Sequence, residues 1–372
     1  MKYRHAILKV RQYGLLKAGQ ILYRKFFPGK YPQAINIEIM TICNLKCRHC
    51  RVTYHGSLIK DVKPAFMKFE LFCEMVDRIT PFIKHANVFQ FSSIEPLFHK
   101  DIFRMMAYVS TKNRNMLFPI LTNAMLFNKD NLRELFQRNV PSISISLDGC
   151  QKETVEAFKT GVSFDRVISN IRLLKKMAPE RINIATVFVA TRNNIHELPD
   201  YITLCADLGI NEVLVNGFLS FLPDHSHLYL YTPQGNNDVS DIFKNTYAQA
   251  EKHGVIVRFP SLAAKPRGCD LSSLLCIDEK GNVAPCIFLA HETPLELFGK
   301  VGRTRKLIFG NVLKDDPLKV WNSRDYVEFR NKLRQRSLPR ECALCADGHG
   351  VICSAKELTP GSMKKNSLWG DK

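Results

Sequence analysis

Three cysteines lie close together near the start of the chain, within residues 41–50, which read TICNLKCRHC. The spacing is C-x3-C-x2-C, and the three residues are Cys43, Cys47 and Cys50. Three thiolates on one loop can bind three irons of a [4Fe–4S] cluster and leave the fourth iron open to a small molecule. A structural zinc ion is the alternative; because zinc needs four ligands, His49 or His55 would have to complete the site.

A second group of cysteines lies in the C-terminal quarter of the chain. Cys269, Gly281 and Cys286 follow the pattern C-x11-G-x4-C, and three more cysteines come after residue 340. Two further, fully ligated clusters would need eight thiolates, so six thiols predict one additional [4Fe–4S] cluster. A zinc site at the same cysteines is the alternative. The six residues are Cys269, Cys276, Cys286, Cys342, Cys345 and Cys353.

Composition supports metal chemistry rather than disulfides. The 372 residues include 12 cysteines. Basic residues interrupt every apolar stretch near the N-terminus, so we expect no secretory signal. The expected location is therefore the cytoplasm, where the thiols stay reduced. Hydrophobic residues make up 45% of the chain and charged residues 24%, which is typical of a globular protein. No apolar run is long enough to predict a membrane-spanning helix.

Positive charge is concentrated at the N-terminus. The formal net charge is +18, and the first 37 residues contain eight Lys or Arg and no Asp or Glu. Residues 1–33 read as a basic amphipathic helix, which we expect to lie peripherally on an anionic membrane surface. Nucleic-acid binding and a solvated helix packed against the rest of the fold are the alternatives.

Short apolar runs alternate with helical patterns from residue 34 onward, which predicts a parallel sheet with crossover helices. Six such units are too few for a closed eight-stranded barrel, so the expected fold is α/β, a partial (β/α)6 TIM-like barrel. The predicted strands are 34–40, 87–91, 116–121, 142–147, 181–189, 212–215 and 255–258, and the predicted helices are 65–78, 101–109, 164–177, 195–208 and 238–253.

The pattern changes after residue 262, where helical periodicity thins out and Cys, Gly and Pro become frequent. We therefore expect a barrel over residues 34–262 and a small cysteine-rich iron–sulfur module over residues 263–356. This module has too little apolar sequence for a large core, so metal ligation should stabilise it. Residues 357–372 read as a flexible tail.

The cysteine triad after the first predicted strand resembles the signature of radical S-adenosylmethionine (radical SAM) enzymes. Residues 93–97 (SIEPL) stand where that family often has Gly-Gly-Glu-Pro, with both glycines replaced. His49, before the last cysteine, occupies a position that is commonly aromatic. Further segments that resemble the family are 121–124 (LTNA), 144–149 (SISLDG) and 194–198 (NIHEL).

This resemblance implies a mechanism and a set of site residues. The open iron would chelate S-adenosylmethionine (SAM), and an electron from flavodoxin or ferredoxin would break the sulfonium bond to give a 5′-deoxyadenosyl radical. That radical would abstract hydrogen from a substrate, and the thiol of Cys150 at the barrel mouth could return a hydrogen atom. The residues expected to bind the nucleotide are Glu95, Thr122, Asn123 and Ser146.

The C-terminal cysteines resemble the auxiliary-cluster modules called SPASM and twitch. The resemblance assigns one auxiliary [4Fe–4S] cluster to Cys269, Cys286, Cys342 and Cys345, while Cys353 and Cys276 could substitute or support a second, incomplete site. In sulfatase-maturing members an acidic residue follows the cysteine of G-x4-C. Ile287 stands there in this chain, which disfavours that particular oxidation.

The substrate is not encoded in any recognisable motif; a peptide, a sugar, another small molecule or a lipid-linked molecule all fit. The recognition domain that peptide-modifying relatives often carry at the N-terminus does not fit in the 33 residues before the first predicted strand. The alternative from another class is a non-catalytic iron–sulfur or zinc protein for electron transfer or sensing. The segments at 93–97 and 144–149 argue against it, because such a protein needs no nucleotide site.

Overall fold

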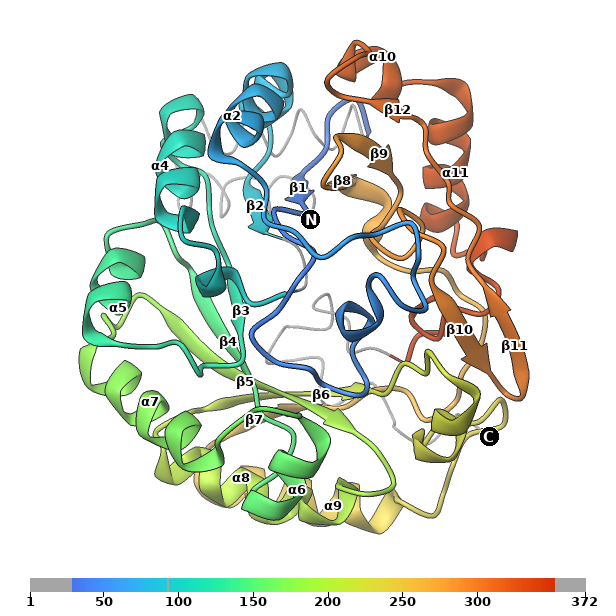
Figure 1. Ribbon diagram of the computed structural model, residues 1–372. Coiled ribbons are helices and arrows are strands. Elements are labelled where there is room, and N and C mark those ends of the chain that lie inside the picture. Colours follow the sequence, from blue (N-terminus) through green and yellow to red (C-terminus); the bar gives the residue numbers. More distant parts are fainter. Residues whose placement is uncertain (1–28, 92–93, 352–372) are drawn as a thin grey trace, which may run out of the picture.

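Two five-stranded sheets form the framework of the protein, as the computed structural model describes it over residues 29–91 and 94–351. The first sheet has the order β3-β4-β5-β6-β7 and is parallel throughout. The second has the order β12-β9-β8-β1-β2, and a parallel bridge between Val88 and Leu117 joins the two (Figure 1). The barrel strands are β1 (Ala34–Ile37), β2 (Val88–Phe91), β3 (Ile120–Thr122), β4 (Ser142–Ser146), β5 (Asn183–Ala190), β6 (Glu212–Gly217) and β7 (Ile256–Arg258).

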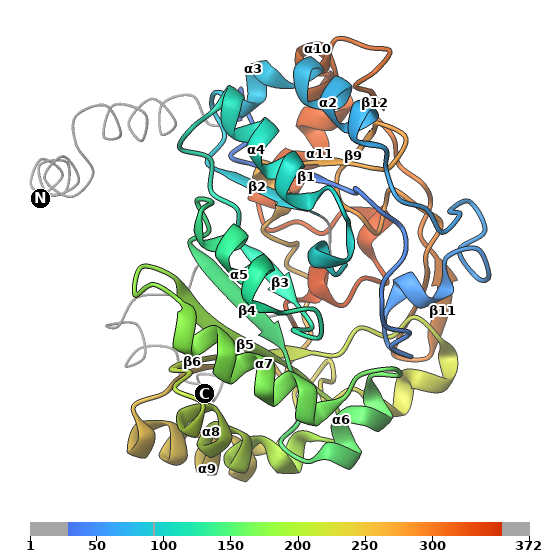
Figure 2. The same cartoon turned by 60° about the vertical axis from the view of Figure 1, so that its left-hand side comes forward.

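Helices cover the outer face of the strands (Figures 1 and 2). Helix α7 shows why: Ser163 caps its N-terminus by accepting from the Arg166 amide, and its buried residues recur at helical spacing. This pattern predicted the helix, and its observed bounds match the prediction. The helices of this layer are α2 (Phe69–Arg78), α3 (Thr80–Ile83), α4 (Ile102–Lys112), α5 (Lys129–Phe136), α6 (Lys152–Phe158), α7 (Phe164–Met177), α8 (Leu198–Asp207) and α9 (Ser240–His253).

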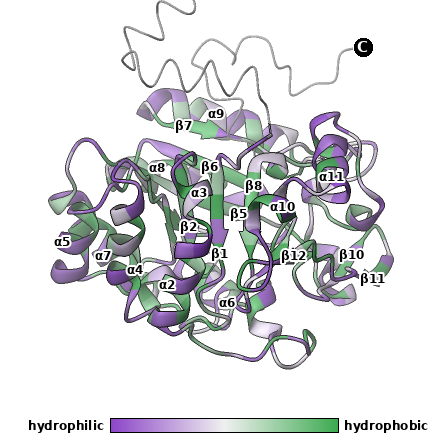
Figure 3. Ribbon diagram, turned by 90° about the horizontal axis from the view of Figure 1, so that it is seen from above, coloured by the Kyte–Doolittle hydropathy of each residue, from purple (hydrophilic) through white to green (hydrophobic). Residues whose placement is uncertain are grey.

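The partial parallel barrel predicted from the alternating pattern is confirmed. Every strand and helix predicted between residues 34 and 258 has a counterpart, with ends shifted by a few residues. Helices α3, α5 and α6 were not predicted. Helix α3 has only four residues, and α5 and α6 are short and mostly polar, so the apolar periodicity of all three is weak. Hydrophobic residues gather on the central strands, and hydrophilic ones on outer helices such as α11 (Arg324–Arg334) (Figure 3).

The cysteine-rich region extends the barrel sheet. Strand β8 (Leu274–Ile277) is buried along its whole length and pairs in parallel with β1, and β9 (Asn282–Ala284) and β12 (Gly310–Asn311) follow it antiparallel. The domain limits at residue 262 stay a prediction, but β8, β9 and β12 of this region join the sheet of β1 instead of forming a sheet of their own. The four apolar residues of β8 contain no sequence signal that their partner is β1, which lies far away in the sequence.

The remaining elements pack beside this sheet. Strands β10 (Pro294–Leu297) and β11 (Lys300–Arg303) form an antiparallel hairpin, and helices α10 (Pro317–Trp321) and α11 follow it. The fully buried Trp321 indole donates to the Gly29 carbonyl at 2.8 Å, which fixes the start of the described chain. In the part of the chain that the structure describes, no helix has the length and apolar character needed to cross a membrane.

Candidate functional site

The loop after β1 carries the three closely spaced cysteines and crosses one end of the barrel (Figures 1 and 2). The Cys50 amide donates to the Cys47 carbonyl at 3.0 Å, and the Thr53 hydroxyl donates to the same carbonyl at 2.7 Å, so the loop is tightly turned. Burial raises the pKa of Cys47 to about 12, and the thiols of Cys50 and Cys43 add to this effect. Three partly buried thiols that affect one another's pKa in this way fit a metal cluster, which would hold them as thiolates.

Hydrogen bonds tie this loop to its neighbours. The Lys46 amide donates to the Thr160 carbonyl at 3.0 Å, just after α6. The Asn123 side chain donates to the Asn44 side chain at 2.9 Å, which connects the loop to the end of β3. The cysteine loop is therefore fixed on two sides of the barrel.

Three of the predicted nucleotide-binding residues form one cluster beside this loop. The Glu95 carboxylate is 2% exposed and accepts from the Asn123 amide at 2.7 Å and from the Thr122 hydroxyl at 2.9 and 3.0 Å. Burial raises the pKa of Glu95 to about 7. The cluster lies at the carboxyl ends of β2 and β3, the edge at which barrels of this kind bind ligands.

Ser146, the fourth of these residues, is held by a buried lysine that the sequence analysis missed. The Lys159 ammonium donates to the Ser146 carbonyl at 2.6 Å and to its hydroxyl at 2.7 Å, and it pairs with Asp148 at 3.0 Å. The side chains of Lys159 and Asp148 are 3% and 0% exposed. The positive charge of Lys159 lowers the pKa of the Cys47 thiol and so partly offsets the effect of burial, which indicates that the ammonium lies near the cysteine loop. No sequence pattern marks it, because it directly follows a short polar helix.

Cys150 lies at the same edge but beside α8. Its amide donates to the Glu197 carboxylate at 2.7 Å, and its thiol lies 3.9 Å from the Glu197 carbonyl. Burial, followed by the charge of Glu197, raises the pKa of Cys150 to about 12. The thiol is thus protonated at neutral pH, as a hydrogen-atom donor must be, and its role stays a prediction.

Four C-terminal thiols converge. Cys269, Cys286 and Cys342 pack against one hydrophobic cluster, and the Cys345 amide donates to the Cys342 carbonyl at 2.9 Å. Burial raises the pKa of Cys342, and the thiols of Cys286, Cys345 and Cys269 add to this effect. Four partly buried thiols that converge in this way fit one tetrathiolate cluster.

Of the other two candidates of this region, the structure describes Cys276 alone. Cys276 is fully buried on β8 and packs in a separate cluster with Ala284, Ile287 and Ala290. Cys353 lies outside the described residues. Their role as substitute ligands stays a prediction.

The histidines proposed for a zinc alternative at the triad have other contacts. His55 is in hydrogen-bonding contact at both ring nitrogens, with the Thr41 carbonyl at 2.8 Å and with Arg51 at 3.1 Å. The His49 ring stacks on Phe158 at 4.1 Å, and burial lowers its pKa to about 4.

Family models match both parts of the chain. The radical SAM superfamily matches residues 37–205, and the iron–sulfur cluster-binding domain called SPASM matches residues 269–346. The chain therefore belongs to the radical SAM superfamily and carries a SPASM domain. This membership implies a SAM-binding [4Fe–4S] cluster and an auxiliary cluster.

Several characterised proteins are similar over most of their length. A tungsten-containing aldehyde ferredoxin oxidoreductase cofactor-modifying protein of Pyrococcus furiosus is 25% identical over 79% of this chain and 82% of its own. An AdoMet-dependent heme synthase of Methanosarcina barkeri is 22% identical over 84% of this chain and 88% of its own.

Among solved structures, Streptococcus suis SuiB bound to S-adenosylmethionine has a TM-score of 0.60 at 15% identity, covering 94% of this chain and 82% of that one. The protein anSMEcpe with bound AdoMet has a TM-score of 0.59 at 18% identity, covering 87% and 89%. These likenesses show the fold.

Proposed function

We propose that this chain cleaves SAM reductively and uses the resulting radical to abstract hydrogen from a substrate at the barrel mouth. The observation that carries the proposal is the convergence of Cys43, Cys47 and Cys50 beside the buried cluster of Glu95, Thr122 and Asn123. When bound, the [4Fe–4S] cluster supplies the electron that converts SAM into methionine and a 5′-deoxyadenosyl radical.

The residues of the chain itself position this chemistry. Glu95 holds the backbone of Asn123, which keeps the end of β3 against the cysteine loop. Lys159 holds Ser146 and balances the charge of Asp148, which fixes the end of β4. We assign nucleotide binding to Glu95, Thr122, Asn123 and Ser146 on this placement.

For the C-terminal region we propose one auxiliary [4Fe–4S] cluster at the four convergent thiols, Cys269, Cys286, Cys342 and Cys345. Ile287 follows Cys286 and packs in an apolar cluster. It supplies no carboxylate at this position, so the oxidation performed by sulfatase-maturing relatives is not part of the proposal. Flavodoxin or ferredoxin is the proposed reductant.

The decisive experiment is anaerobic incubation of the reconstituted protein with SAM and dithionite, followed by mass analysis for 5′-deoxyadenosine. The Cys43→Ala/Cys47→Ala/Cys50→Ala variant should produce none, while Cys73→Ala, a half-buried cysteine on α2, should retain activity. If the triple variant still yields 5′-deoxyadenosine, the site assignment is wrong. The same assay with peptide, sugar and lipid-linked candidates identifies the substrate class from the mass of the product.

We further propose that residues 1–33, most of which lie outside the described residues, bring a cytoplasmic enzyme to an anionic membrane surface. Eight Lys or Arg without an acidic residue among the first 37 support this assignment. Deleting residues 2–30 should abolish co-sedimentation with anionic vesicles and leave SAM cleavage intact. Binding of the full chain to nucleic acid instead, or loss of the clusters on truncation, would contradict it.

A further inference from the structure

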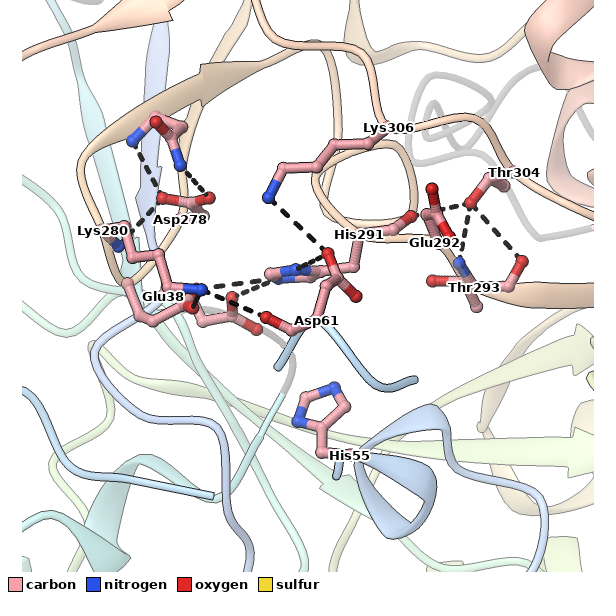
Figure 4. Close-up of polar contacts among 12 residues, drawn as sticks. Glu38, His55, Asp61, Asp278, Lys280, His291, Glu292, Thr293, Thr304 and Lys306 are labelled. Carbon is pink, nitrogen blue, oxygen red and sulfur yellow. Dashed lines mark hydrogen bonds and ion pairs between the residues drawn. The ribbon is translucent and has the colours of Figure 1, made fainter. Parts of the chain in front are cut away.

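A buried group of ionisable side chains that the proposed reaction does not use lies between β1 and the cysteine-rich region (Figure 4). Its centre is His291, whose side chain is 0% exposed. The Nε2 atom of His291 lies 2.8 Å from Glu38 Oε2 and 3.8 Å from Glu279 Oε2. These residues come from the end of β1, the turn between β8 and β9, and the loop after Cys286, so three distant segments meet here.

Several atoms of this group are buried without a hydrogen-bond partner among the described residues. They are Glu279 Oε2, His291 Nδ1 and both carboxylate oxygens of Asp61. Most buried polar atoms in proteins are satisfied, so a convergence of unsatisfied ones indicates a missing ion or water. Glu279 Oε1 pairs with Lys280 at 3.2 Å, whereas Oε2 faces His291 Nε2 and the Glu38 carboxylate, and a cation would balance these two carboxylates.

The separations fit a metal ion. The ligand atoms of Glu38, Glu279 and His291 all lie within 4.8 Å of one another. The other two separations, from His291 Nε2 to the Glu38 and Glu279 oxygens, are 2.8 and 3.8 Å. One position therefore lies about 2.4 Å or less from all three ligand atoms, which is close to the bond lengths of divalent metals with oxygen and nitrogen.

The surroundings resemble the outer shell of a metal site. The second oxygen of Glu38 accepts from Arg51 at 2.7 Å, so only Oε2 faces the centre. In this structure His291 Nε2 hydrogen-bonds to Glu38 Oε2 at 2.8 Å, so a metal ion would replace the Nε2 proton. Nδ1 faces Asp61 Oδ2 at 3.7 Å, and this carboxylate is the nearest acceptor for a proton on Nδ1 once Nε2 binds the metal. Lys306 lies 3.6 Å from the same Asp61 oxygen and holds it (Figure 4).

The carboxylates are also in suitable charge states. Although burial alone would raise it, the pKa of Glu38 is held at about 2 by Arg51 and His291, so Glu38 is ionised at neutral pH. Burial, and then repulsion from Asp278 and Glu38, raises the pKa of Glu279. A cation between them would relieve that repulsion. Glu279 and Asp61 are partly exposed, at 14% and 28%, which provides an entry path.

We propose that Glu38, Glu279 and His291 bind one divalent metal ion of the class that takes oxygen and nitrogen ligands, such as Mn²⁺ or Zn²⁺, with Asp61 orienting the imidazole. The ion would connect β1 to the segment that follows Cys286 and so fix the SPASM domain on the barrel. The competing arrangement is a protonated His291 between Glu38 and Asp61, with no metal.

The test uses the full chain with both iron–sulfur clusters in place, verified by iron and sulfide content. Mn²⁺ is the probe because thiolates bind it weakly, and free Mn²⁺ is followed by electron paramagnetic resonance. The wild type should bind one Mn²⁺ per chain that Zn²⁺ displaces, and Glu279→Gln and His291→Asn should bind it at least tenfold more weakly. Glu292→Gln, an exposed neighbour, is the matched control and should bind like the wild type.

Thermal unfolding provides the second measurement. Mn²⁺ should raise the midpoint of the wild type and of Glu292→Gln, because a ligand that binds only the folded state stabilises it, and leave the Glu279→Gln midpoint unchanged. No saturable Mn²⁺ site in the wild type, or equal binding by Glu279→Gln, overturns the proposal in favour of the protonated histidine. Glu279 is partly exposed, so its isosteric variant should fold even if that of the fully buried His291 does not.

Discussion

Replacing Lys159 by Met should destabilise the protein strongly, because it leaves the buried Asp148 carboxylate without its cation. The two charged atoms are 3.0 Å apart and their side chains are 3% and 0% exposed, so solvent cannot compensate. Removing one partner of such a pair costs about 3–5 kcal/mol. Unfolding entropy of about 2.1 cal/mol/K per residue over 372 residues converts this into a midpoint lowered by about 4–6 °C.

Anaerobic thermal unfolding followed by circular dichroism measures this shift. In the Lys159→Met/Asp148→Asn variant no charge is left unpaired, so we expect at least half of the lost stability to return. SAM cleavage should stay impaired in both variants, since neither holds Ser146. Lys152→Met, which removes an exposed ion pair with Asp165, is the control and should leave the midpoint unchanged. A Lys159→Met midpoint within about 1 °C of the wild type, or a double variant no more stable than the single one, would refute the reasoning.

Three further predictions concern the C-terminal region. The reconstituted wild type should contain about eight irons per chain. Cys286→Ser should contain about four, whereas Cys276→Ser should keep about eight. A wild-type count near four iron atoms with one zinc ion would favour a zinc site. Gly217→Ala should detach the segment around Val351 from β6, because a Cβ there would lie 2.5 Å from the Val351 carbonyl oxygen, and iron content should fall. Trp321→Phe should lower the unfolding midpoint by about 1–3 °C through its lost hydrogen bond and ring contacts, which calorimetry measures.

The barrel could be predicted from the sequence because its signals are local. The helix over residues 164–177 shows its apolar face and its cap within a single stretch. The cysteine triad is equally local, since its chemistry depends on three residues within eight positions. The assignment of Thr122 and Asn123 to nucleotide binding comes from the resemblance of residues 121–124 to the radical SAM family, and both lie at a strand end, where parallel strands present their ligands.

What the sequence did not reveal depends on contacts between distant segments. Lys159 has the same local appearance as the exposed Lys152 at the start of the same helix, and only the fold buries it against Asp148. Glu38 and His291 are 253 positions apart, and nothing near either residue indicates the other. The pairing of β8 with β1 is hidden for the same reason, because hydrogen bonds between parallel strands leave no mark on either strand's sequence.

The pairing of β8 with β1 also has a consequence for how the enzyme is made. About 240 residues separate Ile37 from Leu274, which is about 12–50 s of synthesis at about 5–20 residues per second. During that time one edge of β1 has no partner. The sheet that carries the loop with the first three cysteines is therefore completed only when the last quarter of the chain has been synthesised.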